Sequence, residues 1–235
     1  MRWTRSLLAL MAAMILVADP ASAQSVLRIG LNDDPDALDP TISRAYTGRL
    51  VFAALCDKLF DVTPDLKIVP QLATSYEWGP NQRSVVLKQR PGGKFHDGEP
   101  FNAEAVRFNI ERHLNTPGSV RKSEIGEIKS VDVINDLTVR LNLSEPLVPL
   151  LAALTDRAGM MISPKAAKEL GDRFGTKPVC AGPYSSWSAW PRAKSWASAS
   201  PTTGTRTTST STGWSSSPSP TPPRAWPACA QAIST

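Results

Sequence analysis

Several residue types are scarce in this sequence, and the shortages are unevenly placed along its 235 residues. It contains 2 His and 3 Cys, and none of its 21 Asp and Glu residues lies beyond Asp172. The net charge of +5 comes from the two ends, because the stretch 24–184 carries 20 basic and 20 acidic residues. A neutral central region argues against the basic surface of a nucleic-acid-binding protein, so no nucleic-acid partner is expected.

The common catalytic and metal-binding motifs are also missing. There is no Gly-X-Ser-X-Gly, His-Glu-X-X-His, phosphate-binding loop or Cys-X-X-Cys pattern. The stretch His96-Asp97-Gly98-Glu99 contains metal-ligand residue types, but Asp-Gly first indicates a tight turn between a strand and a helix. His113 precedes the last residue of a predicted helix, where a charged imidazole would interact favourably with the helix dipole. We therefore predict no enzyme activity, no metal and no cofactor.

No hydrophobic run is long enough to span a membrane. The longest, Leu7 to Ala18, would form a helix of about 18 Å against about 30 Å of hydrocarbon. Two arginines precede it and Ala21-Ser22-Ala23 follows it, which is the pattern of a secretory signal peptide. We expect residues 1–23 to be cleaved between Ala23 and Gln24 and the product to reach the periplasm. The alternative is a buried N-terminal helix.

The last 51 residues, 185–235, lack Asp, Glu, Leu, Val and Phe. They contain 13 Ser, 9 Thr, 7 Pro and 5 of the 7 Trp residues. Such a segment buries too little apolar area to offset its ordering entropy, so it is predicted to be disordered. A Ser/Thr/Pro-rich linker or glycosylated stalk is the simplest interpretation, but flexible linkers seldom carry five tryptophans.

A shift of reading frame explains both the tryptophans and the missing acidic residues. When each codon moves by one base, Ser becomes an apolar residue, Thr becomes Asp, Asn, His or Tyr, and Trp becomes Val, Leu or Met. From Ser185 onward, permitted codons can spell a continuation that begins LVERVAQGK and restores acidic and apolar residues. We therefore interpret residues 185–235 as an aberrant tail that follows a frameshift after about residue 184.

The 161 residues from Gln24 to Tyr184 suffice for one domain of mixed α and β structure. Asn102 is a favourable N-cap, and Ser163 precedes a helix with Pro at its first position. In the helix at 46–60, Leu50, Ala53, Ala54 and Cys56 lie near one face. Asn135-Asp136 indicates a hairpin turn. We expect strands at 26–31, 84–88, 128–134, 137–143 and 160–162, and helices at 46–60, 103–114, 147–154 and 164–170.

Four stretches, in this order, resemble the family-5 extracellular solute-binding proteins, which are the peptide and nickel receptors of ABC importers. They are RIGLNDDPDALDP (28–40), VPQLATSYEW (69–78), KFHDGEPFNAEAVRFNIER (94–112) and KPVCAGPY (177–184). The third is the most specific, because several residue types share one spacing. The resemblance implies an α/β, periplasmic-binding-protein-like clamshell. Residues 24–184 would form lobe I with an inserted subdomain at about 48–158, and the second lobe should follow Tyr184.

The resemblance further implies that a solute is held between the two lobes without chemistry. The loop after the first strand and the start of the next helix approach that cleft, so Asn32, Asp33 and Tyr46 are the candidate ligand-binding residues. Each could instead be a loop cap or a packing aromatic. The implied partners are a peptide or similar small solute and the permease subunits of an ABC transporter, with the binding protein a monomer. A chain without lobe II is expected to bind weakly or not at all.

Two points remain open at this level. Cys56 and Cys180 are the only cysteines of the globular part, and an oxidising compartment allows a disulfide between them, the alternative being two buried thiols. Cys229 lies in the tail and should be free. The rival functional class is a secreted hydrolase or wall-associated protein with a Ser/Thr/Pro-rich stalk, against which stand the missing catalytic motifs and the tryptophans.

Overall fold

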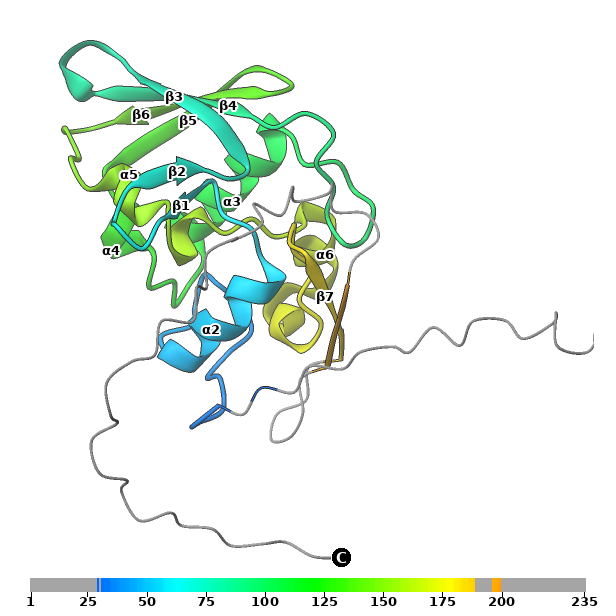
Figure 1. Cartoon of the computed structure of the whole chain (residues 1–235). Helices are drawn as coiled ribbons and strands as arrows, with labels where there is room; N and C mark the ends of the chain where they lie inside the picture. Colours follow the sequence, from blue (N-terminus) through cyan, green and yellow to red (C-terminus); the bar gives the residue numbers. More distant parts are fainter. Residues whose placement is uncertain (1–28, 30, 189–195, 200–235) are drawn as a thin grey trace, which may run out of the picture. The chain divides into compact units, whose positions relative to one another are not determined.

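The computed structural model describes residues 29, 31–188 and 196–199 (Figure 1). The chain divides into two compact units, residues 1–34 and 35–235. The described part of the second unit contains a four-stranded sheet, two β-hairpins and several helices, so the predicted mixture of α and β structure is confirmed. None of the described helices is long and apolar enough to cross a membrane.

The four-stranded sheet is antiparallel and has the order β3-β4-β6-β5. Its strands are β3 (Ala73–Trp78), β4 (Ser84–Gln89), β5 (Ile128–Asn135) and β6 (Thr138–Leu143). Val85 pairs with Leu141 and Leu87 with Val139, and all four side chains are fully buried. These alternate positions place one face of the sheet in the core. The predicted strands at 84–88, 128–134 and 137–143 and their hairpin at Asn135-Asp136 are confirmed.

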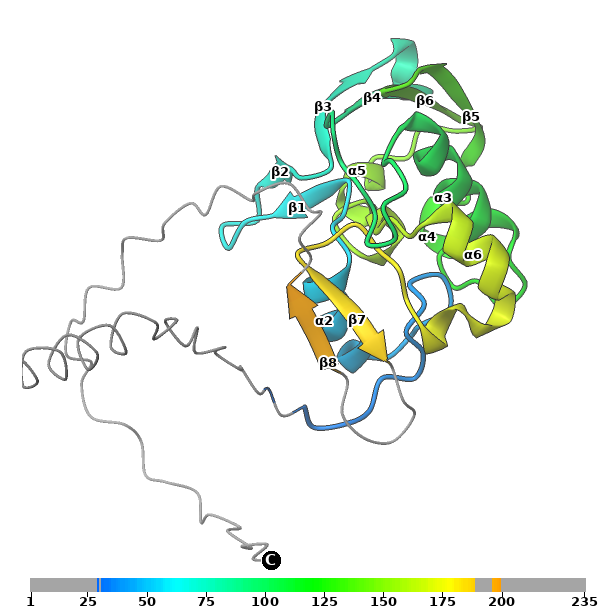
Figure 2. The ribbon, with the colours of Figure 1, turned by 90° about the vertical axis from the view of Figure 1, so that its right-hand side faces the viewer.

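Helix α3 (Ala103–Asn115) covers the buried face of this sheet, with Val106 and Ile110 fully buried (Figures 1 and 2). Its N-terminus is capped as predicted, because Asn102 Oδ1 accepts a hydrogen bond of 2.9 Å from the Ala105 amide. The buried Asn109 amide group bonds both backbone groups of Ile162, at 2.9 and 3.0 Å. The Asn109 side chain therefore holds the end of the segment 160–162. The strand expected at 160–162 is wrong, because the segment forms only isolated bridges, to Lys58 and Cys180.

Replacing Asn102 with alanine is expected to lower the free energy of unfolding by about 1 kcal/mol, because the Ala105 amide loses its acceptor. Asn102→Asp keeps an acceptor oxygen at this position, now of a carboxylate, and should lower the free energy of unfolding by less. Asn115→Ala, at the exposed C-terminal end of the same helix, is the matched control and should stay within ~0.5 kcal/mol of the parent. Urea unfolding compares the three; equal losses for Asn102→Ala and Asn115→Ala would contradict a capping role.

Helix α2 (Tyr46–Leu55) is shorter than the helix expected at 46–60, and it buries a different face. Its buried residues are Gly48, Phe52 and Leu55, whereas Leu50 is 42% exposed. The expected face, which included Leu50 and Ala53, is therefore wrong. The backbone of Cys56 is extended and ends the helix. The chain then continues into the hairpin of β1 (Phe60–Val62) and β2 (Ile68–Pro70). Leu59 and Phe60 are buried in the core as part of this later segment and not as part of the helix.

The remaining helices are short. Ser163 Oγ accepts a hydrogen bond of 3.2 Å from the Ala166 amide, so the predicted cap of the helix at 164–170 is confirmed. The helix expected at 147–154 is reduced to a single turn. These elements are α4 (Lys122–Ile125), α5 (Leu150–Ala153) and α6 (Pro164–Leu170), with 3-10 turns η1 (Pro80–Gln82), η2 (Arg157–Gly159) and η3 (Gly171–Thr176).

The beginning of the tail has regular structure. Strand β7 (Tyr184–Ser188) pairs antiparallel with β8 (Trp196–Ala199) and contacts α2 (Figure 2). The expectation of disorder from residue 185 onward is therefore wrong for 185–188 and 196–199. Backbone pairing needs no particular side chains, which explains how a sequence poor in aliphatic residues can still form a hairpin. Cys229 and the rest of the tail lie outside the described residues.

The N-terminal predictions fall mostly outside the described residues as well. Among them are the signal peptide 1–23, its cleavage site at Ala23 and Gln24, and most of the strand expected at 26–31. The two described positions of that stretch, Ile29 and Leu31, are not in a strand and are 72% and 40% exposed. An apolar run predicts burial only where other residues cover it, so for these two side chains the expectation of a buried strand is wrong.

Candidate functional site

The three residues predicted to bind ligand lie in exposed positions of the two units. Asn32 and Asp33 belong to the unit 1–34, where the Asp34 amide donates a hydrogen bond of 2.8 Å to Asp33 Oδ1. Tyr46 belongs to the unit 35–235, is the first residue of α2 and is 68% exposed. All three side chains are thus accessible to a solute. Their role as ligand contacts remains a prediction.

Asp36 holds the loop that leads into α2. Its Oδ1 accepts hydrogen bonds from Ser43 Oγ at 2.8 Å and the Ala37 amide at 2.9 Å, and its Oδ2 accepts from the Arg44 and Ala45 amides at 2.6 and 3.2 Å. Burial by itself would raise the pKa of Asp36, but these bonds outweigh it and lower that pKa. The charged Asp36 therefore fixes the backbone immediately before Tyr46.

A second carboxylate, Asp39, ties the same loop to helix α3. Arg112 donates to both oxygens of Asp39, at 2.9 and 2.5 Å, and the side chains are only 13% and 6% exposed. Arg112 also donates to Thr41 Oγ1 and lies over the ring of Phe174, 5.6 Å from its centroid. A bidentate pair of this kind is geometrically specific, and removing one partner would leave a buried charge uncompensated.

Two further arginines hold the carbonyl groups of the loop. Arg157 Nη1 donates to Ser43 O at 3.0 Å and to Ala45 O at 3.4 Å, and Arg121 Nη2 donates to Ser43 O at 3.4 Å. Arg121 also forms an ion pair of 2.7 Å with Glu124. The loop that presents Tyr46 is therefore fastened by side chains from several separate parts of the chain. No sequence motif indicated this network, because its members are far apart in the sequence.

His113 faces this loop and is buried, with 1% of its surface exposed. Burial and, to a smaller extent, the charge of Arg112 lower the pKa of His113 to about 3, and Asp39 opposes the shift without cancelling it. The prediction of a charged histidine at the helix C-terminus is therefore wrong. The helix dipole contributes about 0.3–1 kcal/mol at a surface position, which is less than the cost of burying a charged ring beside an arginine.

The His113 ring is held through one of its nitrogens. His113 Nδ1 lies 2.9 Å from Thr41 Oγ1, whose hydroxyl also accepts a hydrogen bond from Arg112. Among the described residues, Nε2 is buried without a hydrogen-bond partner.

The two cysteines of the globular part meet at the end of α2. Cys56 and Cys180 form a disulfide with their Cα atoms 4.9 Å apart. The Asp57 amide donates to Ala181 O at 2.8 Å, which joins the same two segments through the backbone. Gly182 is required here, because a Cβ at this position would lie 2.1 Å from Leu55 O. The segment 180–182 is therefore held tightly against the end of α2.

The turn at 96–99 lies on the other side of that segment. Gly98 has a φ of +87°, which fits the predicted tight turn. His96 bonds backbone groups of 180–182, and Asp97 Oδ2 accepts from Ser163 Oγ at 2.5 Å. Within the described residues, no group of three His, Cys, Asp or Glu side chains could hold a metal ion. This turn has a structural explanation that needs no metal.

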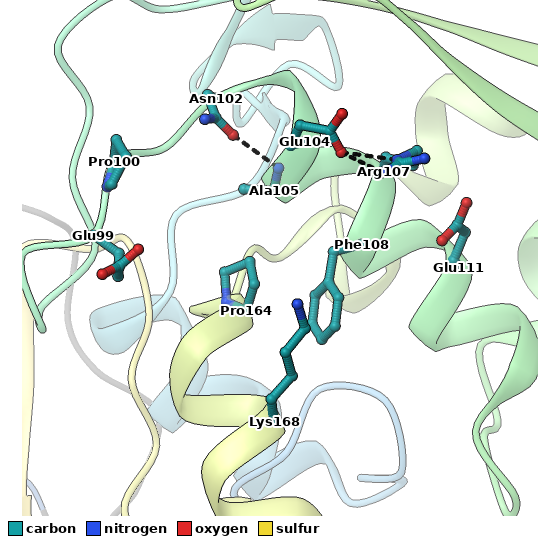
Figure 3. Close-up of a pocket in the computed structure, with 10 residues that line it drawn as sticks. All are labelled: Glu99, Pro100, Asn102, Glu104, Ala105, Arg107, Phe108, Glu111, Pro164 and Lys168. Carbon is teal, nitrogen blue, oxygen red and sulfur yellow. Dashed lines mark hydrogen bonds and ion pairs between the residues drawn. The ribbon is translucent and has the colours of Figure 1, made fainter.

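An open groove of about 380 Å³ lies between α3 and α6 (Figure 3). Glu104 and Arg107 form an ion pair of 2.5 Å on its α3 side. Lys168 extends from α6 over the ring of Phe108, with Nζ 5.3 Å from the ring centroid. Sequence reasoning missed this groove, since its walls come from separate helices. Glu104 and Arg107 are engaged with each other and Lys168 with the ring of Phe108, and we assign the groove no chemical role.

Comparison with known proteins places the chain in a family. The sequence profile described as "Bacterial extracellular solute-binding proteins, family 5 Middle" matches residues 67–195, more than half of the chain. The chain therefore belongs to the bacterial extracellular solute-binding proteins of family 5. This family binds solutes and is not enzymatic, so the predicted absence of enzyme activity is confirmed and a secreted hydrolase is excluded.

Individual relatives agree with this assignment. The glutathione-binding protein GsiB of Pectobacterium atrosepticum is 32% identical over 170 residues, which cover 72% of this chain and 33% of the relative. GsiB of Salmonella typhimurium is 30% identical over 179 residues, 76% of this chain and 35% of the relative. The chain thus spans about a third of the length of the curated relatives that it matches.

Solved structures show the same partial coverage. The binding protein AgaA of A. tumefaciens, in complex with agropinic acid, has a TM-score of 0.68 and 27% identity, over 74% of this chain and 35% of that one. NikA of Brucella suis, in complex with Fe(III)-EDTA, has a TM-score of 0.65 and 25% identity, over 72% of this chain and 34% of NikA. The mixed α and β fold of this chain therefore matches part of a periplasmic binding protein. The assignment of its residues to lobes stays a prediction.

Proposed function

We propose that this chain is the N-terminal part of the periplasmic substrate-binding component of an ABC importer, which captures a small solute for transport across the membrane. The observation that carries the proposal is the family match over residues 67–195, together with a fold shared with solute-bound receptors. Binding of solute would close two lobes around it, and the closed form would dock on the permease subunits. Export to the periplasm would be directed by residues 1–23.

The solute class can be narrowed from the chemistry of the relatives' ligands. Glutathione, agropinic acid and Fe(III)-EDTA, named for three of the similar proteins, are small and polar, and each contains at least one carboxylate group. We propose a peptide or another carboxylate-bearing solute of similar size. Asn32, Asp33 and Tyr46 would be its contacts on this part of the protein, and the network around Asp36 and Asp39 would hold Tyr46 in place.

The composition of the tail supports a further part of the proposal, that the coding frame changes near residue 184. The family match runs past Tyr184 to residue 195, so sequencing of the gene should cover codons 183–196. The expected result is an inserted or deleted base near codon 184, such that the neighbouring frame encodes the continuation beginning LVERVAQGK. An intact frame whose codons cannot encode that continuation would exclude the frameshift and leave the family assignment untouched.

A calorimetric titration with glutathione and a dipeptide mixture tests the binding proposal. The 235-residue chain is expected to bind with a Kd above about 1 mM or not at all, and the full-length protein with restored frame in the micromolar range or tighter. In the full-length protein, Tyr46→Ala should weaken binding about tenfold by removing a contact worth roughly 1.4 kcal/mol. Tyr76→Ala is the matched control, since Tyr76 is a 46% exposed tyrosine of strand β3.

The outcomes separate the parts of this proposal. Equal affinities for Tyr46→Ala and the parent would remove Tyr46 from the site but keep the receptor function. Micromolar binding by the 235-residue chain itself would contradict the expectation that it needs a second lobe. No binding of any carboxylate-bearing solute by the full-length protein would refute the proposed solute class.

A further inference from the structure

His96 makes an unusual set of contacts for a residue in a turn. Its Nε2 lies 2.9 Å from Gly182 O and 3.2 Å from Gly182 N, and the Cys180 amide lies 3.3 Å from its Nδ1. Its own amide donates to Cys180 O at 2.9 Å. A single residue therefore binds both ends of the segment 180–182, more than 80 positions away in the sequence.

The contacts determine the state of the ring. A backbone N–H can only donate and a carbonyl oxygen can only accept. A proton on Nε2 satisfies two contacts, with Gly182 O at 2.9 Å and from the Cys180 amide to Nδ1 at 3.3 Å, whereas a proton on Nδ1 would allow only the contact of the Gly182 amide with Nε2 at 3.2 Å. We therefore place the proton of the neutral ring on Nε2, where it is donated to Gly182 O. Burial lowers the pKa of His96, and the bond to Gly182 and the charge of Asp97 oppose that shift without reversing it. The ring is accordingly neutral at pH 7.

The segment that His96 binds is confined on its other side. A Cβ at Gly182 would collide with Leu55 O at the end of α2, and the disulfide from Cys180 to Cys56 joins the same place. The segment 180–182 is therefore bound by His96 and packed against the end of α2. The chain enters β7 two residues after Gly182.

We propose that neutral His96 is the positioning residue that fixes where the chain leaves the core at Gly182 and in which direction β7 begins. A wider role rests on the proposed function: if this exit leads toward a second lobe, His96 would set one side of the hinge. The local role stands without it, because it follows from the contacts with Cys180 and Gly182.

Protonation of His96 would place a second proton on Nδ1 and break its bond with the Cys180 amide. The charged group that acts on the ring is Asp97 of the same turn. Glu99, also of this turn, is paired with Lys165 of α6 at 3.9 Å. On the side of α2, Asp57 follows Cys56 and its amide bonds Ala181 O. Burial lowers the pKa of His96 although Asp97 favours the protonated ring, so loosening of the segment 180–182 is expected only in acid, below the usual pKa of histidine.

Imidazole ¹⁵N spectra and amide exchange of the 235-residue chain test the proposal. With 2 His in the chain, four ring nitrogen signals are expected, and His96 should show a protonated Nε2 and an unprotonated Nδ1 at pH 7. Exchange of the Cys180 amide is measured relative to that of Leu87, a fully buried residue of the central strand β4 that reports global stability. His96→Leu should accelerate this relative exchange about tenfold, which is the effect of losing one hydrogen bond.

The variant His96→Asn provides the conservative rescue. Its Oδ1 can take the place of Nδ1, so relative exchange at Cys180 should return to within about threefold of the parent. His113→Gln is the matched control and should change exchange at Cys180 and Leu87 in parallel. If His96→Leu does not fold, relative exchange at Cys180 is compared between His96→Asn and His96→Gln instead. Glutamine places its amide farther from the backbone, so it should not restore the hydrogen bond.

Two results would overturn the proposal. One is a protonated Nδ1 on His96 at pH 7. The other is relative exchange at Cys180 that is unchanged in His96→Leu or, should that variant not fold, equal in His96→Asn and His96→Gln. Neither result bears on solute binding by the full-length protein, so failure here is distinguishable from failure of the proposed function.

Discussion

Replacing Cys56 and Cys180 with alanine is expected to lower the free energy of unfolding by ~4 kcal/mol. The disulfide joins residues separated by 124 positions, and cross-linking a loop of this size removes a large part of the entropy of the unfolded chain. Urea unfolding of the oxidised parent and of the double variant measures the difference. The reduced parent should unfold near the double variant, which in turn should be insensitive to reductant.

Cys229→Ala is the matched control for this experiment, because it removes a cysteine that the cross-link does not use. Its unfolding curve should coincide with that of the parent. Titration of thiols in the denatured, unreduced chain should find one reactive thiol out of 3 Cys. Three reactive thiols would show that the disulfide does not form, and identical curves for the oxidised and reduced parent would show that it does not stabilise the protein.

Acidification from pH 6.5 toward pH 3 is expected to cost about 3–5 kcal/mol of stability through His113 alone. Its pKa is about 3 in the folded chain and about 6.5 when unfolded, so between these values only the unfolded chain binds the proton. The contribution is therefore complete above pH 6.5 and is lost progressively as the pH falls to about 3. Asp36, whose pKa is lowered, adds a further loss only below its ordinary value of 3.8.

The variant His113→Gln isolates this effect. Glutamine does not titrate and can keep a hydrogen bond to Thr41. The free energy of unfolding of the variant should therefore depend much less on pH between 6.5 and 4 than that of the parent. Urea unfolding at pH 7, 6, 5 and 4 gives the two slopes. His96→Gln is the control. The pKa of His96 is also lowered, but its ring is only partly buried, so this variant should change the pH dependence less than His113→Gln does. Parallel pH profiles for His113→Gln and the parent would refute the assignment of the acid sensitivity to His113.

Local sequence signals were reliable where the structure depends on neighbouring residues. Asn102 and Ser163 cap their helices as expected, and Asn135-Asp136 joins β5 to β6. A cap or a tight turn is decided within about four residues, so the information lies in the adjacent sequence. The family resemblance was equally accessible, because the fixed spacing within 94–112 is a property of the sequence alone.

Errors arose where distant segments meet. Helix α2 ends at Leu55, five residues before its expected end, at the place where Gly182 and Cys180 pack against it. The charge of His113 was misjudged because its burial depends on the loop at 36–45, about 70 positions earlier. The candidate site shows the same division: the sequence pointed to Tyr46, but not to the arginines that hold its loop.

The sequence by itself determined the family, the neutral charge of the central region, the caps and turns, and the candidate ligand contacts Asn32, Asp33 and Tyr46. The tertiary structure alone decided which face of α2 is buried, that His113 is neutral, and that His96 binds the segment where the chain leaves the core. The physical reason is that burial and hydrogen bonding depend on contacts between residues far apart in the chain. Hydrophobic periodicity and capping patterns carry information about near neighbours only.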